Sequence, residues 1–209
     1  MMSILTVTRR WVAAGAAVLA LAATPARADQ AAEDYVQSIL DEAYVALNVD
    51  DEDAMLDALA DLVDKYVDER RAALFTLGQY ARRITDEQRA EFIPLFKEYA
   101  TTVYQDALAN YSGERLVVTD SVDRSARDII VNSEIANAKP GDQWADVTVH
   151  WRVYRNRNGV MSVLDAGAEG VWLAIEQRSQ FTSVIANNGG GEKGMDALIT
   201  QLREQVEGR

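Results

Sequence analysis

The sequence predicts an α+β fold, in which a twisted four-stranded antiparallel sheet carries helices on one of its faces. Apolar residues recur at helical spacing from about residue 30 to residue 112, then alternate with polar residues from about 114 to 169. Helical spacing returns from about 170 to 206. Strands that follow one another this closely pair as an antiparallel meander. One apolar sheet face then remains for the helices to cover.

Residues 1–28 have the pattern of a secretory signal peptide. Arg9 and Arg10 precede a run of mostly small apolar residues, and Ala26-Arg27-Ala28 is a small-x-small cleavage site. The alternative is a membrane anchor. The apolar run, residues 11–23, would rise only about 20 Å as a helix, less than the roughly 30 Å of a bilayer's hydrocarbon core. We therefore expect export to the periplasm and a single mature domain over residues 29–209.

Composition restricts the partners. The chain has 21 basic and 33 acidic residues, a formal net charge of −12, and its predicted signal segment holds three arginines and no acid, so the mature charge is −15. Such a charge disfavours nucleic acids and anionic membrane surfaces as extended partners, but it does not exclude apolar cargo held inside. With no cysteine and one histidine, the chain cannot form a disulfide or a zinc site built from Cys and His.

The helical segments carry apolar stripes and one clear start signal. Thr85 and Gln88 form a capping box that opens a long helix. The apolar positions of this long helix include Phe92, Phe96, Tyr99 and Val103. Two earlier helices carry the stripes Tyr35, Ile39, Ala43 and Leu47, and Met55, Leu59, Leu62, Val63 and Tyr66. A last helical pattern begins at Val171.

Four strands are expected over residues 115–121, 128–136, 146–154 and 160–168. The third alternates most regularly, and it places one apolar set on one face, with His150 on the other. This set consists of Val147, Val149, Trp151 and Val153.

Candidates for metal or phosphate chemistry have structural explanations that we favour. The acidic cluster 50–53 is reminiscent of a calcium site, but it lacks the glycine and the distal glutamate of an EF-hand loop, and acidic residues are favourable where a helix begins. The glycine-rich segment 187–191 follows no strand and lacks the Gly-Lys-Ser/Thr of a phosphate loop, so it is expected to end a helix. We expect no metal and no cofactor.

Asp165 and Glu169, near the end of the fourth strand, are the best candidates for acid–base chemistry. No partner base is visible beside them. The favoured interpretation is structural, with a carboxylate that caps the following helix or fixes the corner between strand and helix. A pocket-bearing enzyme that uses both residues remains the alternative from another functional class, and a structural adaptor protein is a third.

Several short motifs, in order, resemble those of the MlaC family of periplasmic phospholipid shuttles, also known as toluene-tolerance proteins. They span most of the mature chain, from about Tyr35 to Leu202. The matching segments are Thr76-Leu77-Gly78-Gln79-Tyr80, Thr85-Asp86-Glu87-Gln88-Arg89, Tyr111-Ser112-Gly113-Glu114, Glu169-Gly170-Val171, Gln177-Arg178-Ser179-Gln180-Phe181 and Gly189-Gly190.

The resemblance implies that the helices and the sheet enclose a deep apolar pocket for the acyl chains of a phospholipid, with the headgroup near the mouth. It also implies two partners, an outer-membrane lipoprotein complex and an inner-membrane ABC transporter complex with a membrane-anchored lipid-binding subunit, and a role in outer-membrane lipid asymmetry. The lipid-binding candidates are Leu77, Phe92, Phe96, Tyr99, Val103, Val147, Val149, Trp151, Val153, Leu164, Val171 and Ile175. For each of them, ordinary core packing is the competing explanation.

Four positions depart from the family pattern. One is Pro94 in the long helix, where proline is unusual; the other three concern the pocket. Met161 stands where Trp is usual, Trp172 where Ser is usual, and Gly167 in place of a larger apolar residue. These changes are expected to alter the pocket, so a hopanoid or another lipid is an alternative cargo. No basic residue is clearly placed for a phosphate, which predicts weak headgroup selectivity.

Overall fold

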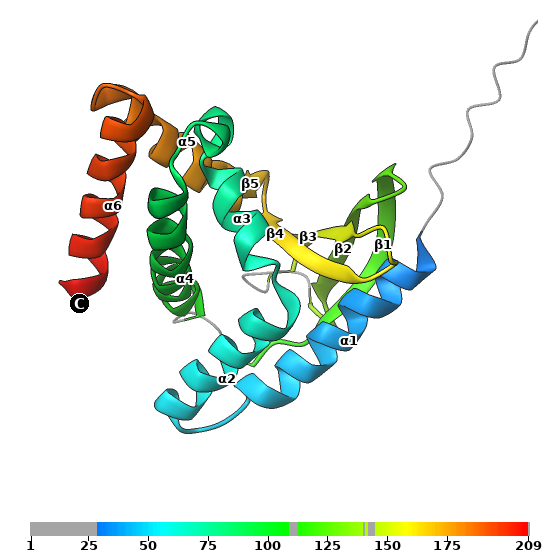
Figure 1. Cartoon of the computed structure of the whole chain (residues 1–209). Coiled ribbons are helices and arrows are strands. Elements are labelled where there is room, and N and C mark those ends of the chain that lie inside the picture. The colour runs from blue at the N-terminus through cyan, green and yellow to red at the C-terminus, as the bar shows by residue number, and fades with distance from the viewer. Residues whose placement is uncertain (1–28, 109–112, 140, 142–144, 209) are drawn as a thin grey trace, which may run out of the picture.

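The computed structural model describes residues 29–108, 113–139, 141 and 145–208; the predicted signal segment, residues 1–28, lies outside them. Helices precede and follow a sheet, which confirms the predicted α+β class (Figure 1). The helices are α1 (Gln30–Leu47), α2 (Glu52–Tyr66), α3 (Glu69–Thr76), the 3₁₀ segment η1 (Gly78–Arg82), α4 (Asp86–Leu108), α5 (Leu173–Asn187) and α6 (Gly191–Glu207). The strands are β1 (Leu116–Ser125), β2 (Asp128–Ile135), β3 (Thr148–Arg155), β4 (Met161–Ala168) and β5 (Val171–Trp172).

The sheet is an antiparallel meander in the order β1-β2-β3-β4-β5. It has one more strand than predicted, because Val171 and Trp172 pair with the end of β4 before α5 begins. Glu169 and Gly170, with φ of 52° and 83°, form the two-residue turn between these strands. Two consecutive positive φ values are typical of a type I′ hairpin turn. Because Val171 and Trp172 belong to the strand after this turn, α5 begins at Leu173, two residues later than the predicted helical pattern.

A row of polar residues at four-residue spacing fixes α1 along strand β1. Asp29 caps α1 by accepting from the backbone N–H of Ala32 (3.0 Å). The next three residues of the row bond to β1 or to the residue before it, since Glu33 accepts from Ser121 (2.7 Å), Gln37 from the backbone N–H of Val118 (2.9 Å) and Asp41 from Arg115 (2.8 Å). Residues four apart lie on one helical face, so this row determines which way α1 is turned.

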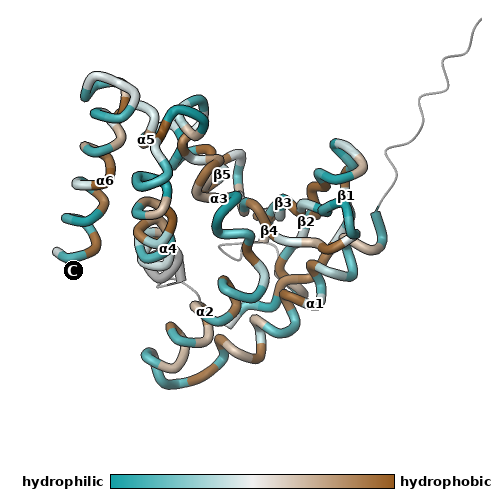
Figure 2. Tube along the Cα trace, viewed as in Figure 1, coloured by the Kyte–Doolittle hydropathy of each residue, from teal (hydrophilic) through white to brown (hydrophobic). Residues whose placement is uncertain are grey.

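The neighbouring row of α1 packs on the sheet. Ala32, Val36 and Leu40 are buried against Ile129, Val131 and Val153 of β2 and β3. Hydrophobic and hydrophilic segments alternate along α1 and α2 in step with their turns (Figure 2). This small core lies beneath α1 and forms one side of the molecule.

A second core lies among α3, α4, α5 and α6, at the other end of the molecule (Figure 1). The rings of Phe92 and Phe96 on α4 meet Phe181 on α5, with centroids 6.1 and 6.3 Å apart. The capping box that opens α4 is confirmed, because the backbone N–H of Gln88 donates to the Thr85 hydroxyl (3.1 Å) and that of Thr85 to the Gln88 side chain (3.2 Å). Within the described residues, no helix combines the length and the apolar run that crossing a bilayer requires.

Helix α3 contacts the sheet face opposite α1, which the prediction of helices on one face did not include. The Arg71 guanidinium lies 3.8 Å from the ring centroid of Tyr154, and Arg152 lies 5.6 Å from that of Phe75. The junction between α2 and α3 also reaches the edge of β4, where the backbone N–H of Asp68 donates to the Val163 carbonyl (3.2 Å). The region around β4 is therefore enclosed by helices on both faces and along its edge.

Gly194 sets the distance between α5 and α6. A Cβ at this position would lie 2.2 Å from the backbone oxygen of Ile185, which is rigid backbone of α5. We predict that Gly194→Ala lowers the free energy of unfolding by about 2 kcal/mol, because the overlap outweighs the helix propensity that alanine adds. Urea titration followed by circular dichroism measures this. The exposed neighbour variant Lys193→Ala should stay within about 0.5 kcal/mol of the wild type, and a Gly194→Ala protein as stable as the wild type contradicts the packing described.

Candidate functional site

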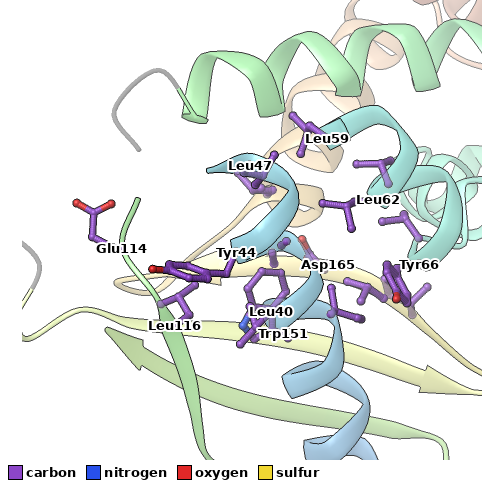
Figure 3. Close-up of a pocket in the computed structure, with 18 residues that line it drawn as sticks. Leu40, Tyr44, Leu47, Leu59, Leu62, Tyr66, Glu114, Leu116, Trp151 and Asp165 are labelled. Carbon is purple, nitrogen blue, oxygen red and sulfur yellow. The ribbon is translucent and has the colours of Figure 1, made fainter. Parts of the chain in front are cut away.

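An apolar cavity of about 310 Å³ lies between the α1–α2 hairpin and the sheet (Figure 3). Side chains of α1 and α2 form one wall, while β1, β3 and β4 form the other. The lining residues are Ile39, Leu40, Ala43, Tyr44, Leu47, Leu59, Leu62, Val63, Tyr66, Val67, Glu114, Leu116, Trp151, Val163, Leu164, Asp165, Ala166 and Leu173. Aliphatic side chains predominate in this set, which suits hydrocarbon.

The polar atoms of the aromatic lining residues Tyr66 and Trp151 are bonded to groups that do not line the cavity. The Tyr66 hydroxyl donates to Glu42 (2.5 Å), and the Trp151 indole N–H donates to the Ser133 hydroxyl (2.9 Å). Hydrogen bonds from Lys65 and Tyr66 hold the pKa of Glu42 below its usual value. The two rings therefore offer mainly apolar surface to the cavity, and a hydrocarbon chain would not have to break these hydrogen bonds.

Asp165 is the exception, a buried carboxyl group in the cavity lining, only 5% exposed. Its Oδ1 accepts from the backbone N–H of Ala174 in the first turn of α5 (2.8 Å), so the expected structural role at the corner between strand and helix is confirmed. Its Oδ2 has no hydrogen-bond partner among the described residues. Burial raises the pKa of this carboxyl group, against the opposing effects of its backbone hydrogen bonds and of Arg152.

Glu169 lies in a different environment, exposed in the turn between β4 and β5. Asp165 lines the cavity and is bonded to the start of α5, whereas Glu169 is absent from the lining, so the two carboxyl groups do not meet in one site. The His150 side chain is in contact with other residues than these two carboxyl groups. Its ring stacks on Trp172, with centroids 5.8 Å apart, and its Nδ1 lies 2.7 Å from the side-chain oxygen of Asn132.

Two of the twelve predicted lipid-binding residues line the cavity, Trp151 on β3 and Leu164 on β4. The other three members of the apolar set predicted on the same strand face as Trp151 do not line the cavity. Val153 is fully buried beneath α1, and Val147 and Val149 are half-buried. Lipid contact for these three residues stays a prediction.

The remaining predicted residues lie elsewhere in the fold. Leu77, Phe92 and Phe96 are buried in the helical core, where Tyr99 packs against them, and Val103 is half-buried on α4. Val171 and Ile175 are 57% and 49% exposed, because the extra strand β5 changes the direction of the chain before α5. None of these seven residues lines the apolar cavity.

The helical wall of the cavity was not among the predicted site residues. Its members come from the apolar stripes of α1 and α2, such as Leu47 and Leu62 (Figure 3). The stripes themselves were visible in the sequence. The signal in the sequence was that two consecutive helices each carry an apolar stripe. Among the described side chains of α2, only Leu62 is buried, so the rest of its stripe is not taken up by core packing.

The three departures that were expected to alter the pocket do not act on the cavity directly, because Met161, Gly167 and Trp172 are absent from its lining. Gly167 and Trp172 pack against each other instead. A Cβ at Gly167 would lie 2.5 Å from the Val171 carbonyl oxygen and 3.0 Å from the Trp172 ring. These residues therefore shape the β4–β5 hairpin.

The chain resembles known proteins along most of its length. It is 25% identical over 145 residues to the intermembrane phospholipid transport system binding protein MlaC of Haemophilus influenzae; the match covers 68% of this chain and 63% of that protein, less than two thirds of its length. Its fold is similar to a phospholipid-binding protein of Ralstonia solanacearum, solved in complex with a phospholipid, with a TM-score of 0.68 and 24% identity over 85% of this chain and 97% of that one.

The sequence profile of the family described as MlaC protein matches residues 30–204, which include every described helix and strand except the last three residues of α6. The chain therefore belongs to the MlaC protein family.

Proposed function

We propose that this protein is a periplasmic carrier that binds the acyl chains of a phospholipid in the apolar cavity and moves the lipid between membranes. The observation that carries the proposal is the cavity itself, a largely aliphatic chamber in which Tyr66 Oη and Trp151 Nε1 are bonded to groups outside the lining. Family membership and the names of the two similar proteins support it. The proposed partners are an inner-membrane ABC transporter complex with its membrane-anchored lipid-binding subunit and an outer-membrane lipoprotein complex.

The energetics of lipid transfer explain why a carrier needs such a cavity. Two sixteen-carbon chains contain about 28 methylenes, and at roughly 0.8 kcal/mol each their removal from water is worth about 20 kcal/mol. A lipid leaves a bilayer only if the carrier buries nearly all of that surface. Release then requires a partner that favours a more open state of the carrier, because cargo shifts the equilibrium toward the state that binds it best.

The cavity must widen to accept a complete lipid. Its volume of about 310 Å³ lies near the lower limit of the roughly 300–1,000 Å³ that ligand pockets span. Helix α2 is the wall best suited to move, because Leu62 is the one buried side chain among those described on it. Exposed ion pairs tie α2 to α1 through Lys65–Glu42 and to α4 through Asp64–Lys97. Exposed ion pairs contribute little stability, typically below about 1 kcal/mol.

The position of Trp151 in the strand wall of the cavity predicts that one variant loses its cargo. Trp151→Asp places a carboxylate among aliphatic side chains, and we expect the lipid that copurifies per protein to fall at least about tenfold. Solvent extraction followed by mass spectrometry measures the amount and also identifies the lipid class, including a hopanoid. The matched control is Trp172→Asp, which changes the tryptophan stacked on His150 outside the cavity and should retain its lipid. A folded Trp151→Asp protein that copurifies with as much lipid as the wild type rules out contact between Trp151 and the acyl chains.

The helical wall predicts a second loss by steric exclusion. Ala43 on α1 lines the cavity, so Ala43→Phe fills part of the chamber and should lower bound lipid by about half or more. Ala31→Phe makes the same change at an exposed position of the same helix and should have no effect. Native mass spectrometry of the two variants compares the lipid-bound fractions directly. Equal fractions would show that the acyl chains lie elsewhere.

A further inference from the structure

A second cavity, of about 240 Å³, adjoins the apolar cavity at strand β4, where Leu164 and Asp165 line both. The cause is a β-bulge. Asp165 pairs with Arg152 and Val163 with Val153, which leaves Leu164 as an extra residue without a partner on β3. A bulge redirects the side chains beside it. The carboxyl group of Asp165 is therefore buried at the point where an aliphatic cavity meets a polar one.

The charged groups of the second cavity are already paired and do not bond to this carboxyl group. Arg152 on β3 donates through Nε and Nη2 to the two carboxylate oxygens of Asp128 on β2, at 2.9 Å each. Arg71 on α3 donates through Nε to Asp68 (3.1 Å). Asp165 Oδ2 has no hydrogen-bond partner among the described residues, so Arg152 acts on Asp165 through its charge and not through a bond to Oδ2.

The other elements around Asp165 supply few ionisable groups. Helix α5 contributes the backbone N–H of Ala174, which donates to Asp165 Oδ1 (2.8 Å). Within the described residues, the remaining ionisable side chains that line either cavity are Tyr154 of β3, Tyr44 of α1, Tyr66 of α2 and Glu114 ahead of β1. Glu114 is half-buried, whereas Asp165 is only 5% exposed. Asp165 is therefore the carboxyl group that cargo in the apolar cavity would cut off from water.

Acyl chains beside Asp165 should favour its neutral form. An ionised carboxylate needs water or hydrogen-bond donors around it, and hydrocarbon offers neither. Burial already raises the pKa of this carboxyl group in the protein, and cargo acts in the same direction. Because proton binding and cargo binding are reciprocally coupled, whatever neutralises Asp165 also strengthens the binding of the acyl chains.

We propose that Asp165 takes up a proton from solvent when acyl chains fill the apolar cavity and returns it when they leave. The proposal rests on the carrier function above and adds control by protons to it. The affinity for lipid then rises as the pH falls through the pKa of Asp165 in the lipid-bound protein. It levels off below the pKa in the lipid-free protein, which itself lies above the ordinary value of 3.8.

The test measures lipid uptake as a function of pH. The purified protein is incubated with limiting amounts of phosphatidylcholine vesicles between about pH 8 and about pH 5, a range in which buried carboxyl groups titrate. The charges of this lipid do not change over the range. After the vesicles are removed, mass spectrometry quantifies the lipid per protein. The lipid bound to the wild type should rise about tenfold or more toward low pH, because uptake of one proton changes the affinity by up to about tenfold per pH unit.

Two variants assign the pH dependence to a residue. Asp165→Asn keeps an oxygen for the N–H of Ala174 and imitates the neutral carboxyl group. At about pH 8 it should bind about as much lipid as the wild type binds at about pH 5, with little change between. The matched control is His150→Gln, because histidine normally changes its charge in this range and His150 lines neither cavity. This variant should keep the wild-type pH dependence. Circular dichroism confirms that each protein is folded at each pH.

Proton uptake by the wild type gives a measurement that needs no variant. Calorimetric titration with a short-chain phosphatidylcholine below its micelle concentration, in two buffers of different ionisation enthalpy, should show net uptake of protons on binding. Lipid binding that is independent of pH, binding without proton uptake throughout the range, an Asp165→Asn protein with the wild-type pH dependence, or its loss in His150→Gln each overturns the coupling and leaves the carrier function intact. A wild type that takes up no lipid at any pH overturns the carrier function itself.

Discussion

The seam between α1 and β1 is the constraint on which the cavity depends. Protein interiors normally close to the density of organic crystals, so an apolar chamber persists only if its walls cannot collapse onto each other. The row Asp29, Glu33, Gln37 and Asp41 holds α1 against β1 at points spread along the helix. The distance of the helix from the sheet is therefore fixed by its contact with β2 and β3. Its carboxyl-terminal half extends past that contact and forms part of the helical wall of the cavity.

Separate cores serve the two halves of the molecule. The aromatic cluster of Phe92, Phe96 and Phe181 closes the helical end, and the smaller core under α1 closes the sheet end. The apolar cavity draws its lining from α1, α2 and the strands, and it shares Leu40, Leu116 and Trp151 with the core under α1. The aromatic cluster of the helical end is therefore separate from the surface kept for cargo, whereas the core under α1 is continuous with it.

The sequence was sufficient for most elements and insufficient for the pocket. Helical spacing, strict alternation around Trp151 and the capping box at Thr85 are local signals, and each was confirmed. Periodicity shows that one side of an element avoids water, but it does not show what that side contacts. Phe92 and Phe96 therefore looked like candidates for lipid contact, although Phe181, far along the chain, packs against them.

The bulge at Leu164 and the short strand β5 were invisible for a related reason. Both depend on pairing between β4 and its neighbours, where one extra residue or two added hydrogen-bonded pairs change which face a side chain occupies. Asp165 owes its place to this arrangement, since its carboxyl group caps α5 and also meets both cavities.

The bonds that Gln37 and Asp68 make to the sheet also bear on how the protein avoids self-association. Gln37 occupies the N–H of Val118 beside a register shift in the outer strand β1, and Asp68 occupies the carbonyl of Val163 on β4. Open strand edges are templates on which another chain can add a strand and begin to aggregate. A protein with a hollow interior has less packing to resist such growth, and these two capped positions interrupt the template on either side of the sheet.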